Sequence, residues 1–320
     1  MDLDFNFDDF KNIGISILRG IFIGIISMGL NAFLVFFPSI FLQSSVENGI
    51  SKAIFALGVS SAILAGLSSP LYGGLLFFLF APMVLIFHYC YANNKSYKFT
   101  FFAMFLVLLA SALAFELGSY YFSDFNFSNF KSDFITSQLD LLRSGFGANV
   151  SQFEMYEDTI KRALDLTFMI MPSFYFIGIL LISYFSYVST ARSLLKKGII
   201  INQPPIFAFL SLPRNFIVGV LLALIAVIIF KQTGVANYVA IYYNLIAISI
   251  FLLFINGLSF ISFLLLRYKM SGPLKFILFL TIVIVPVLSG VAVVLGFFDM
   301  LFQFRKKVSF IRLGSDDEKF

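Results

Sequence analysis

The stretch FILFLTIVIVPVLSGVAVVLGFF, residues 276–298, decides the fold class of this chain. It contains 23 residues and no charged side chain. As one helix, at about 1.5 Å per residue, it would be about 34 Å long. A helix needs about 20 apolar residues to cross the ~30 Å hydrocarbon core of a bilayer. The stretch therefore predicts a membrane-spanning helix.

Apolar residues dominate the rest of the chain as well. Of its 320 residues, 60% are apolar and 12% are charged, and the mean hydropathy is +0.95. A soluble domain is nearer half apolar and a quarter charged. We therefore predict an all-α fold, a polytopic transmembrane helical bundle of about eight membrane segments with amphipathic helices at its surface. The expected segments are 13–37, 52–68, 71–91, 99–122, 165–190, 215–231, 238–266 and 276–298.

Composition also limits the domain organisation and the kinds of partner. No charge-rich or Gly/Ser-rich linker interrupts the chain, so residues 1–320 are expected to form a single integral membrane domain. The single cysteine, Cys90, excludes an internal disulfide, and no Cys/His spacing indicates a metal site, so we expect no cofactor. The net charge of +5 comes from basic residues at segment ends, where lipid headgroups and topology account for them. We expect a lipid bilayer as partner and no nucleic acid.

The N-terminal stretch MDLDFNFDDFK does not resemble a cleavable export signal. It carries four Asp and one Lys, whereas a signal peptide begins with positive charge and continues with a short apolar core. The first apolar run, 13–37, is long enough to remain as a span. We expect it to cross the membrane once.

Three other parts of the chain are more polar than the segments. Residues 123–164 show apolar positions at helical spacing, such as Phe130 and Phe134, which predicts two amphipathic helices. These helices lie either on the membrane surface or as a cap on the mouth of the bundle. Residues 192–214 hold four basic residues, no acid and three prolines, which indicates a basic interfacial elbow. Residues 305–320 are expected to form a polar C-terminal tail.

The charges of the connections conflict with an eight-span arrangement. Connections 92–98, 192–214 and 267–275 hold nine basic residues and no acid. They lie on one side, which the positive-inside rule makes cytoplasmic. The same arrangement places both termini, including the basic stretch 305–312, on the opposite side. Either a segment is miscounted, or the segment containing Pro286 does not fully cross.

Polar groups inside lipid are costly, so those inside the segments are candidates for a site. Asn31, Glu116 and Asn256 are the candidate ligand-binding residues. The alternatives are an interfacial carboxylate at Glu116 and amides that bond across helices at Asn31 and Asn256. His88, near the end of the third segment, is either an interfacial hydrogen-bonding residue or a functional one.

The stretch GFFDMLFQFRKK, residues 296–307, follows the last segment. It places Asp299 at the edge of the apolar run and Arg305 beyond the aromatic residues. The physical pattern is typical of a helix anchored where it leaves the bilayer. Asp299 and Arg305 are retained as possible structural or functional residues.

Enzyme signatures are missing from the sequence. There is no HExxH, no GxSxG, no phosphate loop GxxxxGK[ST] and no paired-carboxylate motif within a segment. We therefore expect a protein that is not an enzyme and has no catalytic residues.

Several of these stretches resemble the YybS-like family of bacterial membrane proteins. The resemblance lies in NGLSFISFLLLR at 256–267, in the closing LGFFDMLFQFRKK at 295–307, in the Ala81-Pro82 pair and in SLPRNF at 211–216. Gly296, Asp299, Phe302, Phe304, Arg305 and Lys306 occupy the places of the family's C-terminal pattern. The chain departs from the family at Met83, Val84, Asn93 and Asn94.

That family is similar, at a distance, to the substrate-binding subunits of energy-coupling-factor vitamin transporters and to the rod-shape protein MreD. The resemblance implies a compact helical bundle in the bacterial cytoplasmic (inner) membrane, with cytoplasmic termini, a pocket between helices and a face that docks partners. Three hypotheses follow. The chain is a small-solute-binding subunit that works with an ATPase and a coupling membrane subunit, a scaffold that works with envelope proteins, or a protein that binds a lipid carrier through its basic elbow.

Overall fold

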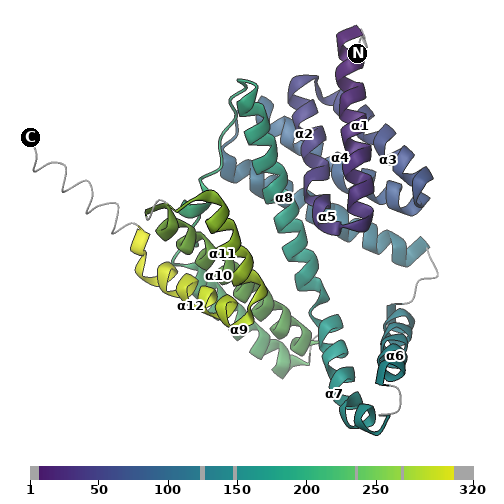
Figure 1. Ribbon diagram of the computed structural model, residues 1–320, viewed down its shortest axis with the longest axis vertical. Coiled ribbons are helices and arrows are strands. Elements are labelled where there is room, and N and C mark those ends of the chain that lie inside the picture. Colours follow the sequence, from purple (N-terminus) through teal and green to yellow (C-terminus); the bar gives the residue numbers. More distant parts are fainter. Residues whose placement is uncertain (1–6, 123–126, 147–149, 235–236, 268–269, 306–320) are drawn as a thin grey trace, which may run out of the picture. The chain divides into compact units, whose positions relative to one another are not determined.

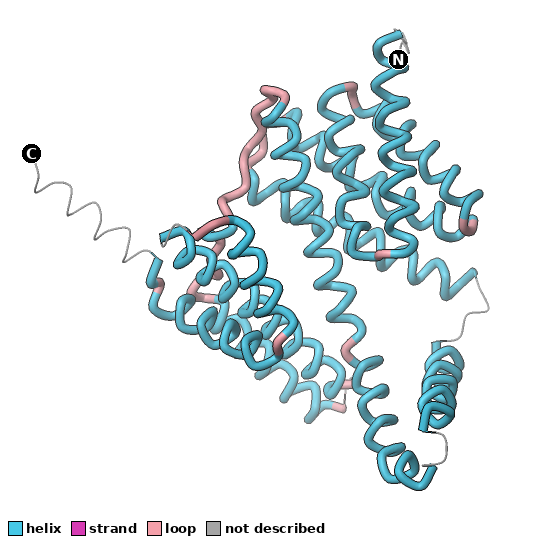
Figure 2. Tube along the Cα trace, in the orientation of Figure 1, coloured by secondary structure: helices cyan, strands magenta, loops and turns pink. Residues whose placement is uncertain are grey.

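The computed structural model describes residues 7–122, 127–146, 150–234, 237–267 and 270–305 (Figures 1 and 2). Every regular element in these ranges is a helix, and none is a strand. The predicted all-α, polytopic fold is therefore confirmed. The chain divides into two compact units, 1–138 with 178–204 and 139–177 with 205–320. The single integral membrane domain expected from the sequence remains a prediction.

The first unit contains the helices of the N-terminal half and most of α8. Its α3–α4 connection is the tight hairpin that residues 68–70 predict. Ser69 caps α4 by accepting a hydrogen bond from the backbone N–H of Tyr72, and Pro70 occupies the first turn, where no N–H is needed. The elements are α1 (Phe7–Gly29), η1 (Asn31–Phe36), α2 (Phe37–Glu47), α3 (Ile50–Leu67), α4 (Pro70–Ala92), α5 (Tyr97–Phe122), α6 (Phe127–Phe146, which extends into the second unit) and α8 (Met171–Lys196, which begins there).

Two glycines bring α1 and α3 together. A Cβ at Gly20 would lie 2.6 Å from Phe41 Cζ and 2.9 Å from Ser60 Oγ. A Cβ at Gly24 would overlap the side chain of Leu64. Gly20 and Gly24 are four residues apart, a GxxxG spacing that here allows close helix packing inside the first unit.

The predicted first segment 13–37 is too long, because the candidate span in this run covers only Lys11–Gly29. α1 ends at Gly29, and the chain then returns through η1 and α2. At about 2.0 Å per 3₁₀ residue and 1.5 Å per α residue, residues 31–47 measure about 28 Å, close to the thickness of a bilayer core. The prediction was wrong because this return carries Pro38, Gln43 and Glu47 and looks like a polar connection.

Polar contacts with α8 show which way the return runs. Ser186 Oγ donates to the Val35 carbonyl (2.9 Å), and Thr190 Oγ1 donates to the Ser39 carbonyl (3.2 Å). Further along, Ser193 Oγ lies 2.7 Å from Gln43 Oε1, and Lys197 Nζ lies 2.7 Å from Glu47 Oε1. In these four contacts the residue numbers increase in the same order along both segments. The return is therefore parallel to α8.

The second unit is built around the long helix α10. Its α7–α8 break at Ile170 corrects the predicted segment 165–190, because α8 starts only at Met171. Asn244 holds this break: its Nδ2 donates to the Met169 carbonyl (2.7 Å), and its Oδ1 accepts from the Ser173 N–H (2.7 Å). The elements are α7 (Val150–Met169), η2 (Phe207–Phe209), α9 (Phe216–Thr233), α10 (Tyr238–Arg267), α11 (Gly272–Ile284) and α12 (Pro286–Phe302).

The predicted connections are found with changed boundaries. Residues 123–164 do contain two helices, α6 and α7, as expected. The predicted elbow 192–214 begins inside α8, which continues to Lys196, and becomes irregular only afterwards. Of the predicted tail 305–320, only Arg305 belongs to the described residues.

The predicted segment 276–298 is also divided between two helices. α11 and α12 meet at Val285 with a bend of 101°, because Pro286 cannot donate the backbone hydrogen bond that would continue α11. α11 and α12 are about 20 and 26 Å long, each shorter than the ~30 Å bilayer core. The prediction of one straight span over 276–298 was wrong.

The α11–α12 pair follows α10 in the chain, and α12 packs against the middle of α10. α11 begins at Gly272, soon after α10 ends at Arg267. Further along α12, Gly296 packs against Gly257, and beyond it the ring of Phe304 lies 6.0 Å from that of Phe260. A helix pair bent this sharply is either a broken span or a re-entrant loop.

The described residues contain seven helices that are long and apolar enough to span a membrane, or up to eight spans if the bent α11–α12 pair counts as one. The η1–α2 return is a further stretch of nearly bilayer length. The orientation of the chain in the membrane remains a prediction.

Candidate functional site

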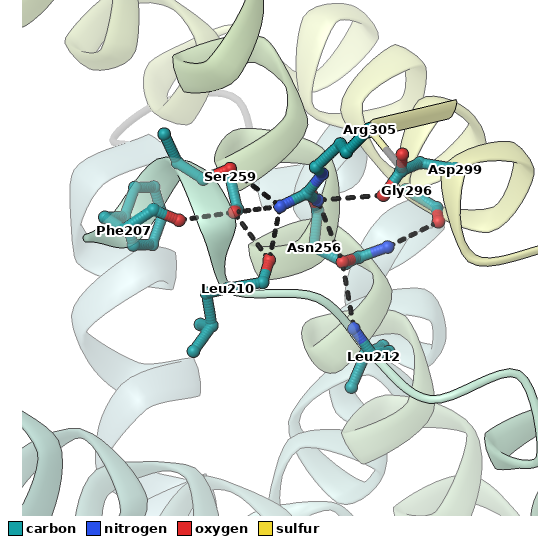
Figure 3. Close-up of polar contacts among 9 residues, drawn as sticks. Phe207, Leu210, Leu212, Asn256, Ser259, Gly296, Asp299 and Arg305 are labelled. Carbon is teal, nitrogen blue, oxygen red and sulfur yellow. Dashed lines mark hydrogen bonds and ion pairs between the residues drawn. The ribbon is translucent and has the colours of Figure 1, made fainter. Parts of the chain in front are cut away.

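Arg305 lies at the centre of the most connected polar cluster of the second unit (Figure 3). α12 ends at Phe302, and the next residue, Gln303, takes the left-handed conformation (φ 50°) and turns the chain back toward α10. Arg305 is therefore directed into the protein, where its side chain is only 7% exposed. We call Arg305, Asp299, Asn256 and Ser259 the Arg305 cluster.

The guanidinium of Arg305 contacts three segments of the chain: α12, α10 and the connection before α9. Nη2 forms a 2.9 Å ion pair with Asp299 Oδ2 on α12 and donates to the Asn256 carbonyl (3.1 Å) and Oδ1 (3.2 Å) on α10. Nη1 donates to the carbonyls of Ala208 (2.9 Å) and Leu210 (2.6 Å), before α9. Nη1 also donates to Ser259 Oγ (2.8 Å). The planar fork of an arginine suits such convergent acceptors.

Asn256 and Ser259 extend the network around the arginine. Asn256 Nδ2 donates to the Gly296 carbonyl (2.7 Å), and the Leu212 N–H donates to Asn256 Oδ1 (3.2 Å). Ser259 Oγ lies 2.5 Å from the Phe207 carbonyl and 2.6 Å from that of Leu210. The cluster therefore fastens the connection before α9 to both α10 and α12.

Close backbone approach makes this geometry possible. A Cβ at Gly257 would overlap the Ala292 carbonyl, and a Cβ at Gly296 would overlap that of Leu253. Only glycine at both positions lets α10 and α12 touch along their backbones.

The electrostatics of the cluster favour a fixed ion pair. Burial lowers the pKa of Arg305 from its ordinary value, and Asp299 opposes that shift; an arginine nevertheless stays protonated in proteins. Among the described residues, Asp299 Oδ1 and Arg305 Nε have no hydrogen-bond partner, while the remaining polar atoms of the guanidinium are engaged. Both terminal nitrogens of the guanidinium, Nη1 and Nη2, are occupied by the protein itself, so the arrangement suits a structural role.

A pocket lies in the first unit. It measures about 150 Å³ and is formed by the end of α4, the start of α5, α8 and the connection that follows it. We call it the α4–α5–α8 pocket. Tyr187 Oη donates to the Asn202 carbonyl (2.5 Å), and Asn202 Nδ2 donates to the Lys95 carbonyl (2.6 Å), so these bonds hold the connection over the pocket. Its polar lining comes from Cys90, Asn94, Lys95, Thr100, Tyr187 and Asn202.

The structure brings together three of the six residues singled out from the sequence. Asn256, Asp299 and Arg305 meet in the Arg305 cluster. Asn31 is exposed at the start of η1. His88 and Glu116 lie toward the C-terminal ends of α4 and α5, which form a hairpin, so they are at opposite ends of it. None of these three lines the α4–α5–α8 pocket, and their functional roles remain predictions.

Sequence reasoning missed Ser259 and the pocket residues. Ser259 is three positions after Asn256 and therefore on the same face of α10, a signal that was available. Lys95, Tyr187 and Asn202 meet only through the folding of the connection after α8. Nothing in their sequence spacing indicates that meeting.

The fold and the Arg305 cluster define a polytopic helical membrane protein with a sharply bent C-terminal helix pair. The chain belongs to the family described as Predicted membrane protein (DUF2232), whose pattern it matches over residues 14–300. No curated protein and no solved structure matches the chain.

Proposed function

We propose that this protein is a non-enzymatic, solute-binding membrane subunit of the transporter type, and that the α4–α5–α8 pocket holds the solute. The single observation behind the proposal is this pocket, which combines hydrogen-bonding groups with aromatic walls. Small-molecule sites generally have this composition. A separate ATPase module and a coupling membrane subunit would supply the energy.

The walls of the pocket define the kind of solute. Lys95 is the one charged residue of the lining, and Phe87, Tyr91 and Tyr187 supply aromatic surface. The rings of Phe87 and Tyr187 meet edge-on at 6.0 Å. Such a site favours a small, flat or anionic polar solute, because Lys95 offers a cation and no acid opposes it.

The volume limits the size of the solute. The pocket measures about 150 Å³, whereas drug-sized ligands occupy about 300 to 1,000 Å³. A solute of vitamin size would require the connection after α8 to move away. The bonds of Asn202 to Tyr187 and Lys95 are the contacts that such an opening would break.

Thermal unfolding in detergent tests the proposal. A panel of amino acids, nucleobases and vitamins is added to the purified protein, and the change in Tm is recorded for the wild type and for Lys95→Met. We expect at least one compound to raise the Tm of the wild type and to lose most of that effect in Lys95→Met. Lys98→Met, a neighbour that does not line the pocket, is the matched control. A panel without any effect, or one acting equally on both variants, contradicts the proposal.

A scaffold of the bacterial envelope is the second candidate function. The observation in its favour is the apolar face of α6, where Phe130, Phe134 and Leu141 are exposed. An amphipathic helix of this kind docks on a membrane surface or on a partner. If the scaffold hypothesis holds, the double variant Phe134→Ser with Leu141→Ser should lose the envelope proteins that co-purify with the wild type. If it does not hold, the same proteins should co-purify with both, and solute binding should be unchanged.

A further inference from the structure

A second pocket, of about 120 Å³, lies in the first unit between α1, α2 and the end of α8. We call it the α1–α2–α8 pocket. α1 contributes Asn12 and Arg19, which are two turns apart on one helix face. α2 and its end contribute Gln43, Glu47 and Asn48, and Lys197 follows α8.

The charges of this pocket do not cancel. Lys197 Nζ lies 2.7 Å from Glu47 Oε1 and 2.8 Å from Oε2, and Gln43 Nε2 donates to Oε1 (2.9 Å). The carboxylate of Glu47 is thus engaged. Arg19 forms no ion pair or hydrogen bond with any residue that the structure describes. One positive charge remains on the pocket wall.

The position of Arg19 makes the uncompensated charge informative. It lies within the candidate span Lys11–Gly29, about 12 Å along the helix axis beyond Lys11. Charged residues inside membrane spans are costly and generally pair with another group or face a polar cavity. Arg19 has the cavity and, among the described residues, lacks the partner.

We propose that the α1–α2–α8 pocket binds a phosphate group, which pairs with Arg19. Guanidinium groups bind phosphate oxygens through parallel N–H donors. The side-chain amides of Asn12 and Asn48 line the same pocket and supply further donors. A phosphate has few heavy atoms and fits a volume of roughly four water molecules, at about 30 Å³ each.

The shared chemistry is the phosphate, and two sources supply it: the headgroup of an anionic lipid, or a free inorganic phosphate. The pocket lies where α1 begins and α2 and α8 end, on the side of the basic connections. Anionic lipids and soluble phosphates both reach that side. This site is distinct from the α4–α5–α8 pocket, and the proposal stands whether or not that pocket holds a solute.

Thermal unfolding in dodecyl maltoside, which carries no phosphate, tests the site. One arm adds phosphatidylglycerol to the micelles, a second adds inorganic phosphate, and a third adds sodium chloride at matched ionic strength. Wild type is compared with Arg19→Gln and with Lys196→Gln. Lys196 loses the same charge next to Lys197 but does not line the pocket, so it controls for general electrostatic attraction.

We expect phosphatidylglycerol or inorganic phosphate, but not sodium chloride, to raise the Tm of the wild type and of Lys196→Gln by several degrees. In Arg19→Gln, the concentration of the compound that gives half of the maximal rise in Tm should be at least ten times higher. A response to the lipid alone identifies a headgroup site, and a response to inorganic phosphate identifies a site for a soluble phosphate. The proposal is overturned if neither compound acts, or if Arg19→Gln responds like Lys196→Gln. Folding of Arg19→Gln is checked by its Tm in the absence of both compounds.

Discussion

The Arg305 cluster and the α1–α2–α8 pocket each contain an arginine and a carboxylate, yet their surroundings differ. Arg305 is 7% exposed, pairs with Asp299 and contacts several carbonyls. Arg19 is exposed on a pocket wall, where Lys197 already occupies the only carboxylate of the lining. Residue type alone does not distinguish a charged side chain that stabilises the fold from one that is available to bind a ligand. Burial and the number of protein partners do.

Labelling from one side of the membrane gives the largest effect, because it is all or none. In a Cys90→Ser background, Lys11→Cys and Lys98→Cys should react with an impermeant thiol reagent from the same side, and Thr233→Cys only from the other. The reason is the η1–α2 return: a crossing by this stretch would put the start of α1 on the same side of the membrane as the α4–α5 turn. Reaction of Lys11→Cys together with Thr233→Cys would restore the simple eight-span arrangement.

Breaking the buried ion pair should have the next largest effect. Asp299→Asn leaves the Arg305 charge uncompensated in a site where Asp299 is 2% exposed. Losing one partner of a buried pair costs about 3–5 kcal/mol. Unfolding by sodium dodecyl sulfate in mixed micelles measures the loss. Arg214→Gln, whose guanidinium makes an exposed contact with the Leu301 carbonyl (3.2 Å), serves as the control and should change little.

Close packing of α10 on α12 gives a smaller but clear effect. Gly257→Ala should cost about 1–3 kcal/mol, the usual range for overpacking, because the new methyl group meets the Ala292 carbonyl. Gly290→Ala on α12 is the matched control, since its Cβ would meet nothing within 4 Å. Equal stability of the two variants in the same unfolding assay would show that the backbones do not touch.

The ion pair at the end of the α2–α8 contacts should matter least. The side chains of Lys197 and Glu47 are 48% and 21% exposed. Exposed pairs contribute about 0–1 kcal/mol, and salt screens them. Lys197→Gln should therefore change the free energy of unfolding by less than about 1 kcal/mol. If Lys197→Gln lowers the free energy of unfolding as much as Asp299→Asn does, the buried and the exposed ion pair do not differ as described.

Hydrophobicity predicted the class of fold and most of the crossings. It failed where a segment is broken or disguised. Residues 276–298 are apolar throughout, so only Pro286 marks the bend. The return through α2 carries Ser39, Gln43 and Glu47, which look like a polar connection because their partners on α8 lie about 150 residues later in the sequence.

The candidate site shows the same limit. Asn256, Asp299 and Arg305 were identified singly, because polar groups near lipid are conspicuous. Their meeting depends on the left-handed Gln303 and on the contact of Gly257 with Gly296. Neither feature follows from a periodic pattern of apolar or polar residues in the sequence. Arg19 was missed because a single basic residue in the first apolar run looks incidental until the pocket beside it is known.

The most direct test compares the two arginines in one assay. Arg305→Gln and Arg19→Gln are unfolded in phosphate-free detergent, alongside the wild type. The account predicts a loss of about 3–5 kcal/mol for Arg305→Gln, because it orphans buried Asp299. Arg19→Gln should stay within about 0.5 kcal/mol of the wild type, as exposed substitutions usually do. A comparable loss in both variants would contradict the account, since Arg19 would then stabilise the fold as Arg305 does.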